Sequence, residues 1–436
     1  MLWVSGDQNT YRSRLVDPVL ADAMGAFAAV MVVGPRATGK TTTAARLAAQ
    51  IDRLDIPDVA SAYRADPDAA LRRAQRPLLL DEWQEVPEVL AAVKRAVDRD
   101  RTAGQYLLTG SIRATTDLST WAGTGRVVRI DMHPLAEREI DGDVESDGLV
   151  PRLRRDWLGG IPDRLPELTI DDYLHLASRG SFPDLAFSDR TERQRTLWLD
   201  SYLDDLVTRD VESIDAPRDP QRLRRYLTAL ALNLAGQPSD ASLIRDAGIN
   251  AKTAAAYERA LTGLAILDIV PAWASSRLKR LSKAGKRYLV DTALAAAAAG
   301  VNERDLVHDG DLRGRWFDAF AVMQLRADLA VASPRMSVYH LRVETGRHEI
   351  DVVIDVGRGR LFGIEFKAGA APTREDARHL LWLRDELGKN FVGGIVLHAG
   401  QAVVELDERI AAVPLSAMWS PLTMKFESDR ASRRRS

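Results

Sequence analysis

Short apolar runs alternate with helix-favouring segments over the first third of the chain. Four of these runs have the length and composition of buried strands, at residues 28–33, 77–80, 105–109 and 126–131. Strands that alternate with helices are typical of a mostly parallel sheet with helices on its faces. The pattern therefore predicts an α/β domain in the first 140 residues.

The apolar pattern changes further along the chain. An acidic stretch at 141–148 indicates a solvated linker. Residues 170–234 have apolar positions at helical spacing, such as Trp198, Tyr202 and Leu206, and predict a helical region. Residues 236–300 predict two helices and a hairpin, residues 305–415 return to mixed α/β, and the basic tail at 427–436 is expected to be disordered.

Composition narrows the class of protein. The chain has 436 residues, of which 46% are hydrophobic and 28% charged, and its net charge is −2. Contact with nucleic acid would therefore need a local basic patch. Cysteine is absent, which excludes disulfides, thiolate zinc sites and thiol catalysis. The sequence shows no secretory signal, and its apolar runs are too short to span a bilayer. We therefore expect a cytoplasmic protein with no membrane partner.

Residues 34–41, Gly-Pro-Arg-Ala-Thr-Gly-Lys-Thr, match the phosphate-binding pattern G-x-x-x-x-G-K-[ST]. A β-prone run precedes them and a helix-favouring run, 41–50, follows, as this pattern requires. Glycines let the backbone turn its N–H groups towards phosphate oxygens, the lysine reaches the β- and γ-phosphates, and the threonine hydroxyl ligates Mg²⁺. We expect ATP to be bound by Gly34, Pro35, Arg36, Ala37, Thr38, Gly39, Lys40, Thr41 and Thr42.

A second nucleotide motif follows at residues 77–82, Pro-Leu-Leu-Leu-Asp-Glu. An all-apolar strand belongs in the middle of a parallel sheet, and its terminal carboxylates emerge at the edge where ligands bind. Asp81 is predicted to hold Mg²⁺, and Glu82 to polarise the attacking water. In isolation the pair could also be two exposed acids that end a strand. Thr109 and Ser111, after the next strand, are either γ-phosphate sensors or helix caps.

Residues 242–261 have the spacing of a helix-turn-helix, with Gly248 at the turn. The second helix offers Lys252, Tyr257 and Arg259 to a ligand. The loop 277–287 then carries six basic residues and no acid, as a wing that contacts DNA phosphates would. A charged hairpin that makes only protein contacts has the same pattern, so both interpretations stay open.

The C-terminal region has an acidic cluster of its own. In residues 348–354 strict alternation would place Ile350, Val352 and Ile354 on one face and Glu349 and Asp351 on the other. A hairpin with residues 361–367 would bring Glu365 and Lys367 to Asp351. This is the D…E-x-K arrangement of restriction-endonuclease-like folds, in which carboxylates hold Mg²⁺ and the lysine orients water. The proposed metal ligands there are Asp318, Asp351 and Glu365, and the proposed catalytic residues Asp351, Glu365 and Lys367.

Charge alternation on an exposed strand is common, and such a fold can keep its shape without cutting. Asp318 starts an otherwise apolar helical stripe. A buried carboxylate is costly unless it is paired, and coordination of a metal ion would offset that cost.

Several motifs of this chain together resemble a bacterial and archaeal family of AAA-type ATPases. Besides the motifs described above, they are Leu-Thr-Gly-Ser at 108–111, Gly125-Arg126 leading to Pro134-Leu-Ala-Glu-Arg-Glu, residues 202–210, and Lys286-Arg-Tyr-Leu-Val-Asp-Thr. The resemblance spans nearly the whole chain. It implies that Arg126 is a sensor or finger arginine, in cis or in a neighbouring subunit of a homo-oligomer, with Arg209 as a weaker candidate. The family often has Glu where this chain has Asp318.

The resemblance completes the predicted architecture: a P-loop AAA-type parallel sheet domain, a helical lid, a winged helix-turn-helix and a restriction-endonuclease-like α/β domain. The predicted boundaries are 1–140, 141–235, 236–300, 301–420 and a basic tail at 421–436. The predicted function is an Mg²⁺-dependent ATPase whose nucleotide state controls a nucleic-acid-directed module. The alternatives are a signalling ATPase with an inactive nuclease-like fold that binds partners, and a member of a toxin–antitoxin pair.

Overall fold

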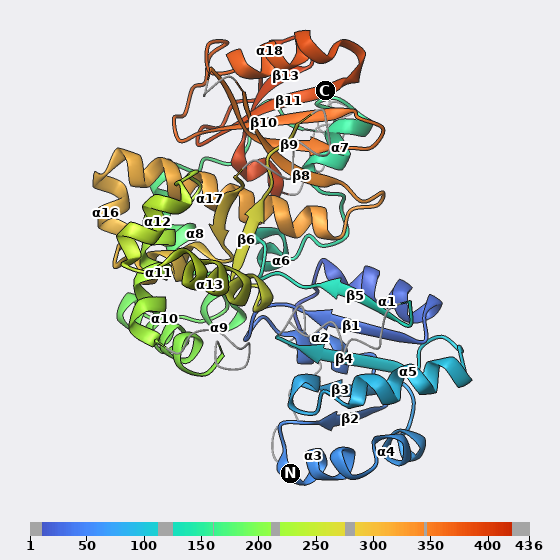
Figure 1. Ribbon diagram of the computed structural model, residues 1–436. Coiled ribbons are helices and arrows are strands. Elements are labelled where there is room, and N and C mark those ends of the chain that lie inside the picture. Colours follow the sequence, from blue (N-terminus) through green and yellow to red (C-terminus); the bar gives the residue numbers. More distant parts are fainter. Residues whose placement is uncertain are drawn as a thin grey trace.

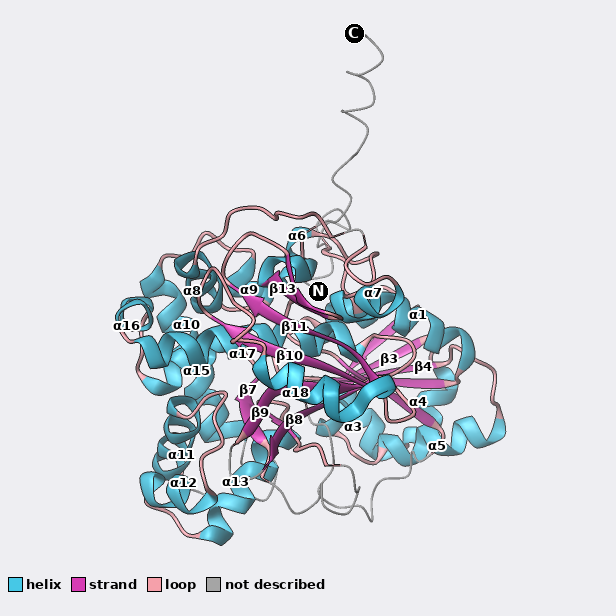
Figure 2. Ribbon diagram, turned by 90° about the horizontal axis from the view of Figure 1, so that it is seen from above, coloured by secondary structure: helices cyan, strands magenta, loops and turns pink. Residues whose placement is uncertain are grey.

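The computed structural model describes residues 11–111, 125–159, 161–210, 219–274, 284–343 and 347–420. These form an N-terminal α/β domain, a helical part and a C-terminal α/β domain (Figure 1). Viewed from above, α1, α3, α4 and α5 gather around the strands of the N-terminal sheet, and the helical part stands beside them (Figure 2). No helix within the described ranges is long and apolar enough to cross a membrane.

The N-terminal domain is built on a parallel five-stranded sheet, as the sequence predicted. Its strand order is β2-β3-β4-β1-β5. The strands are β1 (Ala29–Val33), β2 (Gln50–Arg53), β3 (Leu78–Asp81), β4 (Tyr106–Gly110) and β5 (Val127–Asp131). The helices are α1 (Val16–Ala26), α2 (Lys40–Ala45), α3 (Pro57–Ala65), α4 (Pro67–Arg73), α5 (Val89–Arg99) and α6 (Glu137–Asp141).

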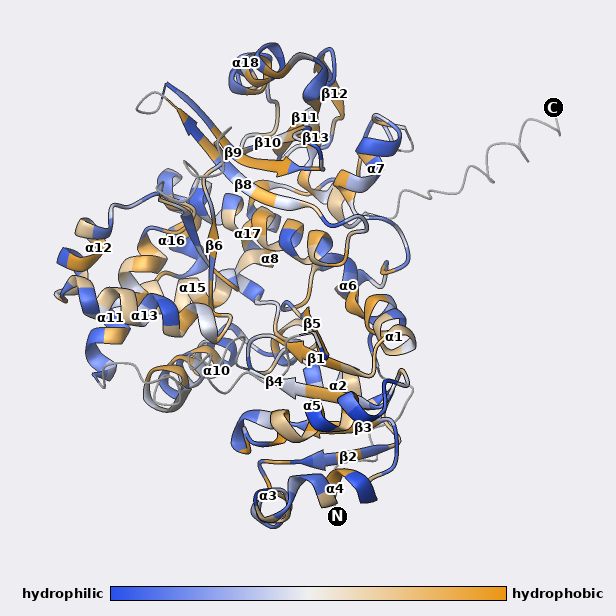
Figure 3. Cartoon of the chain, turned by 45° about the vertical axis from the view of Figure 1, so that its right-hand side comes forward, coloured by the Kyte–Doolittle hydropathy of each residue, from blue (hydrophilic) through white to orange (hydrophobic). Residues whose placement is uncertain are grey.

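The sheet is covered on both faces, which explains why its central strands are apolar throughout. Met31 and Val33 of β1 pack with the apolar residues of α3, α4 and α5, whereas Val30 and Val32 pack with α1 and α2. The hydrophobic colour of β1 contrasts with the polar edge strand β2 (Figure 3). The predicted helix at 41–50 is too long: α2 ends at Ala45, and Gln50 begins β2 because that segment pairs with β3.

The helical part lies to one side of the N-terminal domain (Figure 1). Polar side chains cap most of its helices; Thr169, Thr191, Asp219, Ser239, Asn250 and Asp291 each accept a backbone N–H of the first turn. Its helices are α8 (Ile170–Arg179), α9 (Pro183–Ala186), α10 (Glu192–Asp205), α11 (Pro220–Leu232), α12 (Asp240–Ala247), α13 (Ala251–Gly263), α15 (Thr292–Ala299) and α16 (Glu303–His308). A two-stranded antiparallel hairpin, β6 (Leu267–Val270) with β7 (Lys286–Leu289), follows α13.

The two helices and the hairpin predicted for residues 236–300 are present as α12, α13 and the β6–β7 pair, whereas a winged helix-turn-helix stays a prediction. Gly248 has φ +63° at the turn, a conformation that favours glycine. The four basic residues between 277 and 283 lie outside the described ranges. DNA binding by this region stays a prediction.

The C-terminal domain has the predicted order of elements, a helix, three strands, a helix and a strand. Its six-stranded sheet has the order β12-β13-β11-β10-β9-β8. The elements are α17 (Gly310–Ala330), β8 (Ser337–Val343), β9 (His348–Asp355), β10 (Leu361–Lys367), α18 (Arg378–Leu387), β11 (Phe391–His398), β12 (Val404–Asp407) and β13 (Ile410–Pro414). One face packs on α18, and the other shares its core with α17 and the helical part.

Strand β9 does not alternate as predicted. Tyr339 pairs with Val353 but Leu341 pairs with Ile350, so three steps along β9 oppose two along β8. This is a β-bulge in β9 directly before Val353, and it places Ile350 in the core on the α18 side while Val352 and Ile354 face the other core. The prediction that Ile350, Val352 and Ile354 share a face is therefore wrong.

Helix α7 (Leu149–Arg155) belongs with the C-terminal domain, although the sequence assigned 141–235 to the linker and lid. Its apolar residues Leu149, Val150 and Leu153 join the core beneath the C-terminal sheet. Trp157 lies against Gly393 of β11, where a Cβ would be 2.7 Å from its ring. The chain thus visits the C-terminal domain before it forms the helical part, which an apolar helical pattern alone cannot reveal.

Three buried charges at the end of the N-terminal domain join all three parts of the molecule. Glu137 pairs with Arg179 of α8 at 2.6 Å, Arg138 pairs with Asp328 of α17, and Glu139 pairs with Arg14 at 2.8 Å. We call Glu137, Arg138 and Glu139 the charged joint. Breaking one such buried pair leaves an uncompensated charge, so the joint fixes how the parts meet.

The joint should also give the protein a characteristic pH dependence. Burial raises the pKa of Asp328 to about 6, even though Arg138 opposes the shift. A carboxyl whose folded pKa is raised stabilises the folded state most at low pH, and this contribution is lost as pH rises from about 4 to about 6. The free energy of unfolding of the wild type, measured relative to that of Asp328→Asn, should fall over this window by up to about 3 kcal/mol. If the free energies of unfolding of the two proteins differ by the same amount at every pH between 4 and 7, the prediction is wrong.

Candidate functional site

The phosphate loop, residues 34–39, connects β1 to α2 at the carboxyl edge of the sheet. Ala37 and Gly39 have φ values of +59° and +91°, a local conformation that turns successive N–H groups towards one side. A Cβ on Gly34 would overlap the carbonyl oxygen of Met132. Only glycine fits there, and it lets the start of the loop pack closely against the segment that follows β5. We call this loop, residues 34–39, the cradle.

Side chains of the loop are held in place by its own backbone. Thr38 is buried and its hydroxyl donates to the carbonyl of Pro35 at 2.8 Å. Lys40 Nζ donates to the same carbonyl at 2.7 Å, so its ammonium lies within the cradle. Thr41 and Thr42 start α2 and line the cavity above it. The predicted nucleotide-binding residues are thus brought together.

Thr41 of α2, Asp81 of β3 and Thr109 of β4 form a hydrogen-bonded chain. Asp81 Oδ1 accepts from the hydroxyl of Thr41 at 2.7 Å and from that of Thr109 at 2.5 Å. Asp81 is 3% exposed, so these bonds fix its carboxylate. Thr109 therefore orients Asp81, a role that neither sequence-based interpretation of Thr109 had included. Hydroxyl and carboxylate oxygens beside a phosphate cradle are the ligands that Mg²⁺ prefers.

Glu82 lines the same cavity. It has φ +53°, a conformation that costs energy in a residue other than glycine. Its carboxylate accepts a hydrogen bond from the amide of Gln84. The cavity has a volume of about 550 Å³, within the range of small-molecule sites, and its lining includes Arg36, Lys40, Thr41 and Glu82.

The helical part covers one side of this cavity. Pro183 and Asp184 of α9 line it, and the hydroxyl of Tyr202 on α10 donates to the carbonyl of Arg36 at 3.4 Å. Phe182, Trp198 and Tyr202 pack their rings 5.0 to 5.4 Å apart behind this contact. A bound nucleotide would therefore touch both the sheet domain and the helical part.

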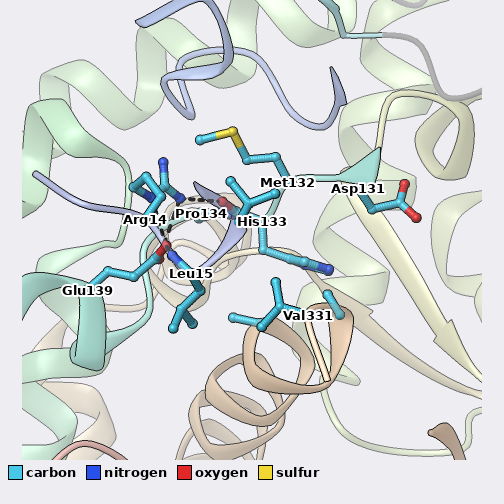
Figure 4. Close-up of a pocket in the computed structure, with 11 residues that line it drawn as sticks. Arg14, Leu15, Asp131, Met132, His133, Pro134, Glu139 and Val331 are labelled. Atoms are coloured by element: carbon cyan, nitrogen blue, oxygen red, sulfur yellow. Dashed lines mark hydrogen bonds and ion pairs between the residues drawn. The ribbon is translucent and has the colours of Figure 1, made fainter. Parts of the chain in front are cut away.

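Arg14 supports the phosphate loop from behind. Its guanidinium donates to the carbonyl of Thr38 at 2.7 Å, to the carbonyl of His133 at 2.8 Å and to Glu139 of the charged joint at 2.8 Å. Figure 4 shows Arg14 between Glu139 and the main chain of His133. Sequence reasoning missed this residue, because its partners are distant in the chain and no motif marks it. Arg14 links the phosphate loop to the joint.

Arg126 does not reach the nucleotide cavity of its own chain. It precedes β5, whose first residue Val127 is level with Ala29 at the start of β1, whereas the phosphate loop follows the end of β1. Its guanidinium pairs with Asp98 at 2.8 Å. The predicted sensor role in cis is therefore wrong, and a finger role in a neighbouring subunit stays a prediction. The side chain of Arg209 lies outside the described part of the chain.

The C-terminal acids do come together, but with an unpredicted partner. Lys286 of β7 is 3% exposed, and its Nζ donates to Asp351 Oδ1 at 2.8 Å. Asp351 also accepts the N–H of Phe366 at 3.2 Å. In the described residues, no three His, Cys, Asp or Glu side chains are arranged to hold a metal ion. The predicted metal site of Asp318, Asp351 and Glu365 is thus not assembled here, since an ammonium lies among its carboxylates.

Burial dominates the electrostatics of this cluster. It raises the pKa of Glu365 well above its usual range, and the negative charge of Asp351 raises it further. The pKa of Asp318 is raised well above its usual range in the same order, by burial and then by Asp351. Burial would also raise the pKa of Asp351, but Lys286 outweighs it and the pKa is lowered. Lys367 is half exposed, 3.8 Å from Asp376 at the edge of the cluster.

Three residues that were predicted to face nucleic acid are buried or paired with other residues of the chain. Tyr257 is buried, 6.0 Å from the ring of Tyr226, so it cannot read bases. Arg287 pairs with Glu258 and Asp240, each at 2.7 Å. Lys286 is in the acidic cluster. The apolar helix face and the hairpin strand bury these side chains, and the predictions for them are wrong.

Comparison with known proteins divides the chain into three matched segments. Residues 26–141 match an AAA domain, residues 170–305 a domain of unknown function (DUF8612) and residues 313–418 another (DUF4143). Uncharacterised proteins of Mycobacterium tuberculosis and Mycobacterium bovis are each 25% identical to this chain over 392 residues, covering 88% of it and 79% of the relative. The Walker-type ATPase of Pyrococcus abyssi is similar in structure with a TM-score of 0.42 at 13% identity, over 67% of this chain and 97% of that one.

The predicted AAA-type ATPase domain is confirmed for residues 26–141 by the first match. The predicted boundary at 235/236 falls inside the second matched segment. The restriction-endonuclease-like character of the C-terminal domain stays a prediction, because the third match is to a domain of unknown function.

Proposed function

We propose that this chain is an Mg²⁺-dependent ATP hydrolase whose nucleotide state is transmitted to the C-terminal domain. The observation that carries the proposal is that the cradle, Lys40, Thr41 and Glu82 line one cavity, while the hydroxyl of Thr41 donates to the buried Asp81, which Thr109 also holds. Phosphoryl transfer to water needs positioned phosphates, charge neutralisation and an oriented nucleophile. These groups match those three requirements.

Each group has a separate task in this scheme. The backbone N–H groups of the loop and Lys40 would bind the β- and γ-phosphates. Thr41 and Asp81 would hold Mg²⁺, which neutralises charge on the phosphate oxygens when bound. Glu82, which lines the cavity, would accept the proton of the attacking water. Thr109 keeps the carboxylate of Asp81 in one orientation.

Two hydrogen bonds of Ser181 connect the helical side of the nucleotide cavity to the sheet domain and to the segment after β7. Ser181, directly before the aromatic cluster, donates its backbone N–H to Asp291 at 2.8 Å, and its carbonyl accepts from Leu135 of the sheet domain at 2.8 Å. Asp291 follows β7, the strand that carries Lys286 into the C-terminal acids. A movement of the helical part on nucleotide binding would therefore displace Asp291, and with it the strand β7 that carries Lys286.

The position of Lys286 favours a regulatory or partner-binding C-terminal domain over a nuclease. Lys286 Nζ is 2.8 Å from Asp351 Oδ1, and among the described residues no three His, Cys, Asp or Glu side chains are arranged to hold the metal ion that a nuclease of this type would use. The nucleic-acid-directed module remains the other candidate, supported by the basic residues between 277 and 283. Turnover measured with and without DNA separates the two: a change below about twofold supports regulation by protein contacts, and a marked stimulation that weakens with salt supports nucleic acid.

Metal removal tests the proposed activity directly. Phosphate release from ATP should require Mg²⁺, fall to background in excess EDTA, and return when Mg²⁺ is restored. The reason is that Asp81 and Thr41 can hold the phosphates only through a cation, since a carboxylate repels them directly. Turnover that persists unchanged in EDTA would contradict the proposal.

A further inference from the structure

Arg14 and Glu139 form a buried ion pair behind the phosphate loop, with side chains that are 5% and 4% exposed (Figure 4). Glu139 Oε1 accepts from Arg14 Nε and from the backbone N–H of Leu15, each at 2.8 Å. Its other oxygen accepts the N–H of Ala136 at 2.8 Å. Neither Arg14 nor Glu139 is among the described residues that line the nucleotide cavity. An effect of either side chain on a bound nucleotide must therefore pass through another residue.

That residue is Thr38, whose carbonyl accepts from Arg14 Nη1 at 2.7 Å. The peptide that joins Thr38 to Gly39 is trans and planar, so its carbonyl and its N–H point in opposite directions. The N–H of Gly39 therefore points away from Arg14. Gly39 lines the cavity and Arg14 lies on the other side of the loop. The hydrogen bond from Arg14 thus turns a backbone donor towards the place where the phosphates would bind.

Arg14 is held from its other sides as well. Its backbone N–H donates to Asp17 Oδ2 at 3.0 Å, and its Nη2 donates to the carbonyl of His133 at 2.8 Å. A guanidinium is a rigid planar fork, so its bonds to Glu139, His133 and Thr38 cannot change independently. The direction of the Thr38 carbonyl is therefore set in part by the carboxylate of Glu139.

We propose that Arg14 is a positioning residue of the nucleotide site, through which the carboxylate of Glu139 sets the affinity for nucleotide. The inference rests on the proposed binding of ATP at the phosphate loop and names the residues that tune it. Thermodynamic linkage gives the converse, that a bound nucleotide strengthens the pairing of Arg14 with Glu139 by the same factor. Because Glu139 belongs to the charged joint, a bound nucleotide then stabilises the joint at α6.

Replacing Glu139 with glutamine tests this, because glutamine keeps the shape and removes the charge that orients the guanidinium. We expect Glu139→Gln to bind Mg²⁺ and ADP about three- to thirtyfold more weakly than the wild type, measured by calorimetric titration. ADP is used because its β-phosphate would reach the loop and no hydrolysis disturbs the titration.

Asp328→Asn is the matched control, since it also removes a carboxylate from a buried pair of the joint. Glu139 keeps its bonds to Arg14, Leu15 and Ala136 in that variant. Asp328→Asn should therefore bind ADP within about twofold of the wild type, a change too small to count as coupling. The thermal transition without nucleotide measures how far each substitution destabilises the fold. Equal losses of ADP affinity in the two variants would overturn the proposal and make Glu139 a structural ion-pair partner only.

The double variant Arg14→Met/Glu139→Gln shows whether Glu139 acts through Arg14. If it does, the double variant loses no more ADP affinity than Arg14→Met alone, because the carboxylate then has no guanidinium to orient. Additive losses would contradict the proposal. Should Arg14→Met fail to fold, the comparison of Glu139→Gln with Asp328→Asn decides alone.

Phosphate release from ATP by the wild type is measured beside these titrations. Unchanged ADP affinity in Glu139→Gln, together with Mg²⁺-dependent hydrolysis by the wild type, would remove this inference and leave the proposed function standing. A wild type that binds neither ADP nor ATP would overturn both.

Discussion

Replacing Glu82 with glutamine should slow ATP turnover by about a hundredfold or more while ATP still binds. General bases typically contribute about 10²–10⁴-fold to a rate, and glutamine has nearly the same shape but cannot accept a proton from water. Glu82 lines the cavity from a left-handed backbone position, and glutamine can adopt that backbone at a similar cost. Steady-state phosphate release and an independent binding titration measure the two effects separately.

Glu85→Gln is the matched control for this variant. Glu85 lines the same cavity and carries the same charge, but it is exposed and lies three residues further along the chain. If Glu82 acts as the base, Glu85→Gln should turn over ATP at nearly the wild-type rate. Equal loss in both variants would show that the negative potential of the cavity matters and not a proton acceptor. Turnover by Glu82→Gln within twofold of the wild type would remove Glu82 from the mechanism.

The nucleotide site could be predicted from the sequence because its requirements are local. Gly34, Gly39, Lys40 and Thr41 lie within eight residues, and the conformation of that segment alone aims them at a phosphate. Asp81 ends an apolar strand, and strands of a parallel sheet carry their ligands at one edge. Strand pairing then brings Asp81 to Thr41. Few contacts from outside the domain are needed.

The other features depend on contacts between distant segments. Lys286 enters a cluster on strands more than sixty residues further along the chain, and only the packing of the hairpin against β8 decides that it faces inward. The β-bulge in β9 breaks an alternation that the residues themselves would allow. Arg126 has the side chain that a sensor residue needs, but it precedes β5 and so lies at the opposite edge of the sheet from the phosphate loop. In each case tertiary pairing, rather than local propensity, determines the outcome.

The Lys-Arg-Tyr-Leu-Val-Asp segment, residues 286–291, held a signal that could have been used. A lysine at the start of an apolar strand and an aspartate at its end are costly to bury unless each has a partner. Lys286 finds Asp351, and Asp291 binds the N–H and hydroxyl of Ser181. Both partners lie in other parts of the molecule. The pattern could therefore predict that the strand joins two parts, but not which residues it meets.

Replacing Lys40 with alanine should weaken ATP binding about ten- to a hundredfold. A hydrogen bond to a charged group contributes about 1.5–3 kcal/mol, and each 1.4 kcal/mol is tenfold in affinity. Lys40 is buried with its ammonium inside the cradle, 2.7 Å from the carbonyl of Pro35, so its charge already lies where a phosphate would bind. Calorimetric titration with ATP and Mg²⁺ measures the change. Lys94 is a half-buried lysine on α5 that pairs with Asp98, and Lys94→Ala is the control for a lost positive charge away from the cavity and should bind as the wild type does. Because alanine also removes the internal bond to Pro35, the thermal transition without nucleotide should be compared for all three proteins. An unchanged ATP affinity in a folded Lys40→Ala protein would mean that the loop does not grip a triphosphate, and the proposed hydrolase activity would fall with it.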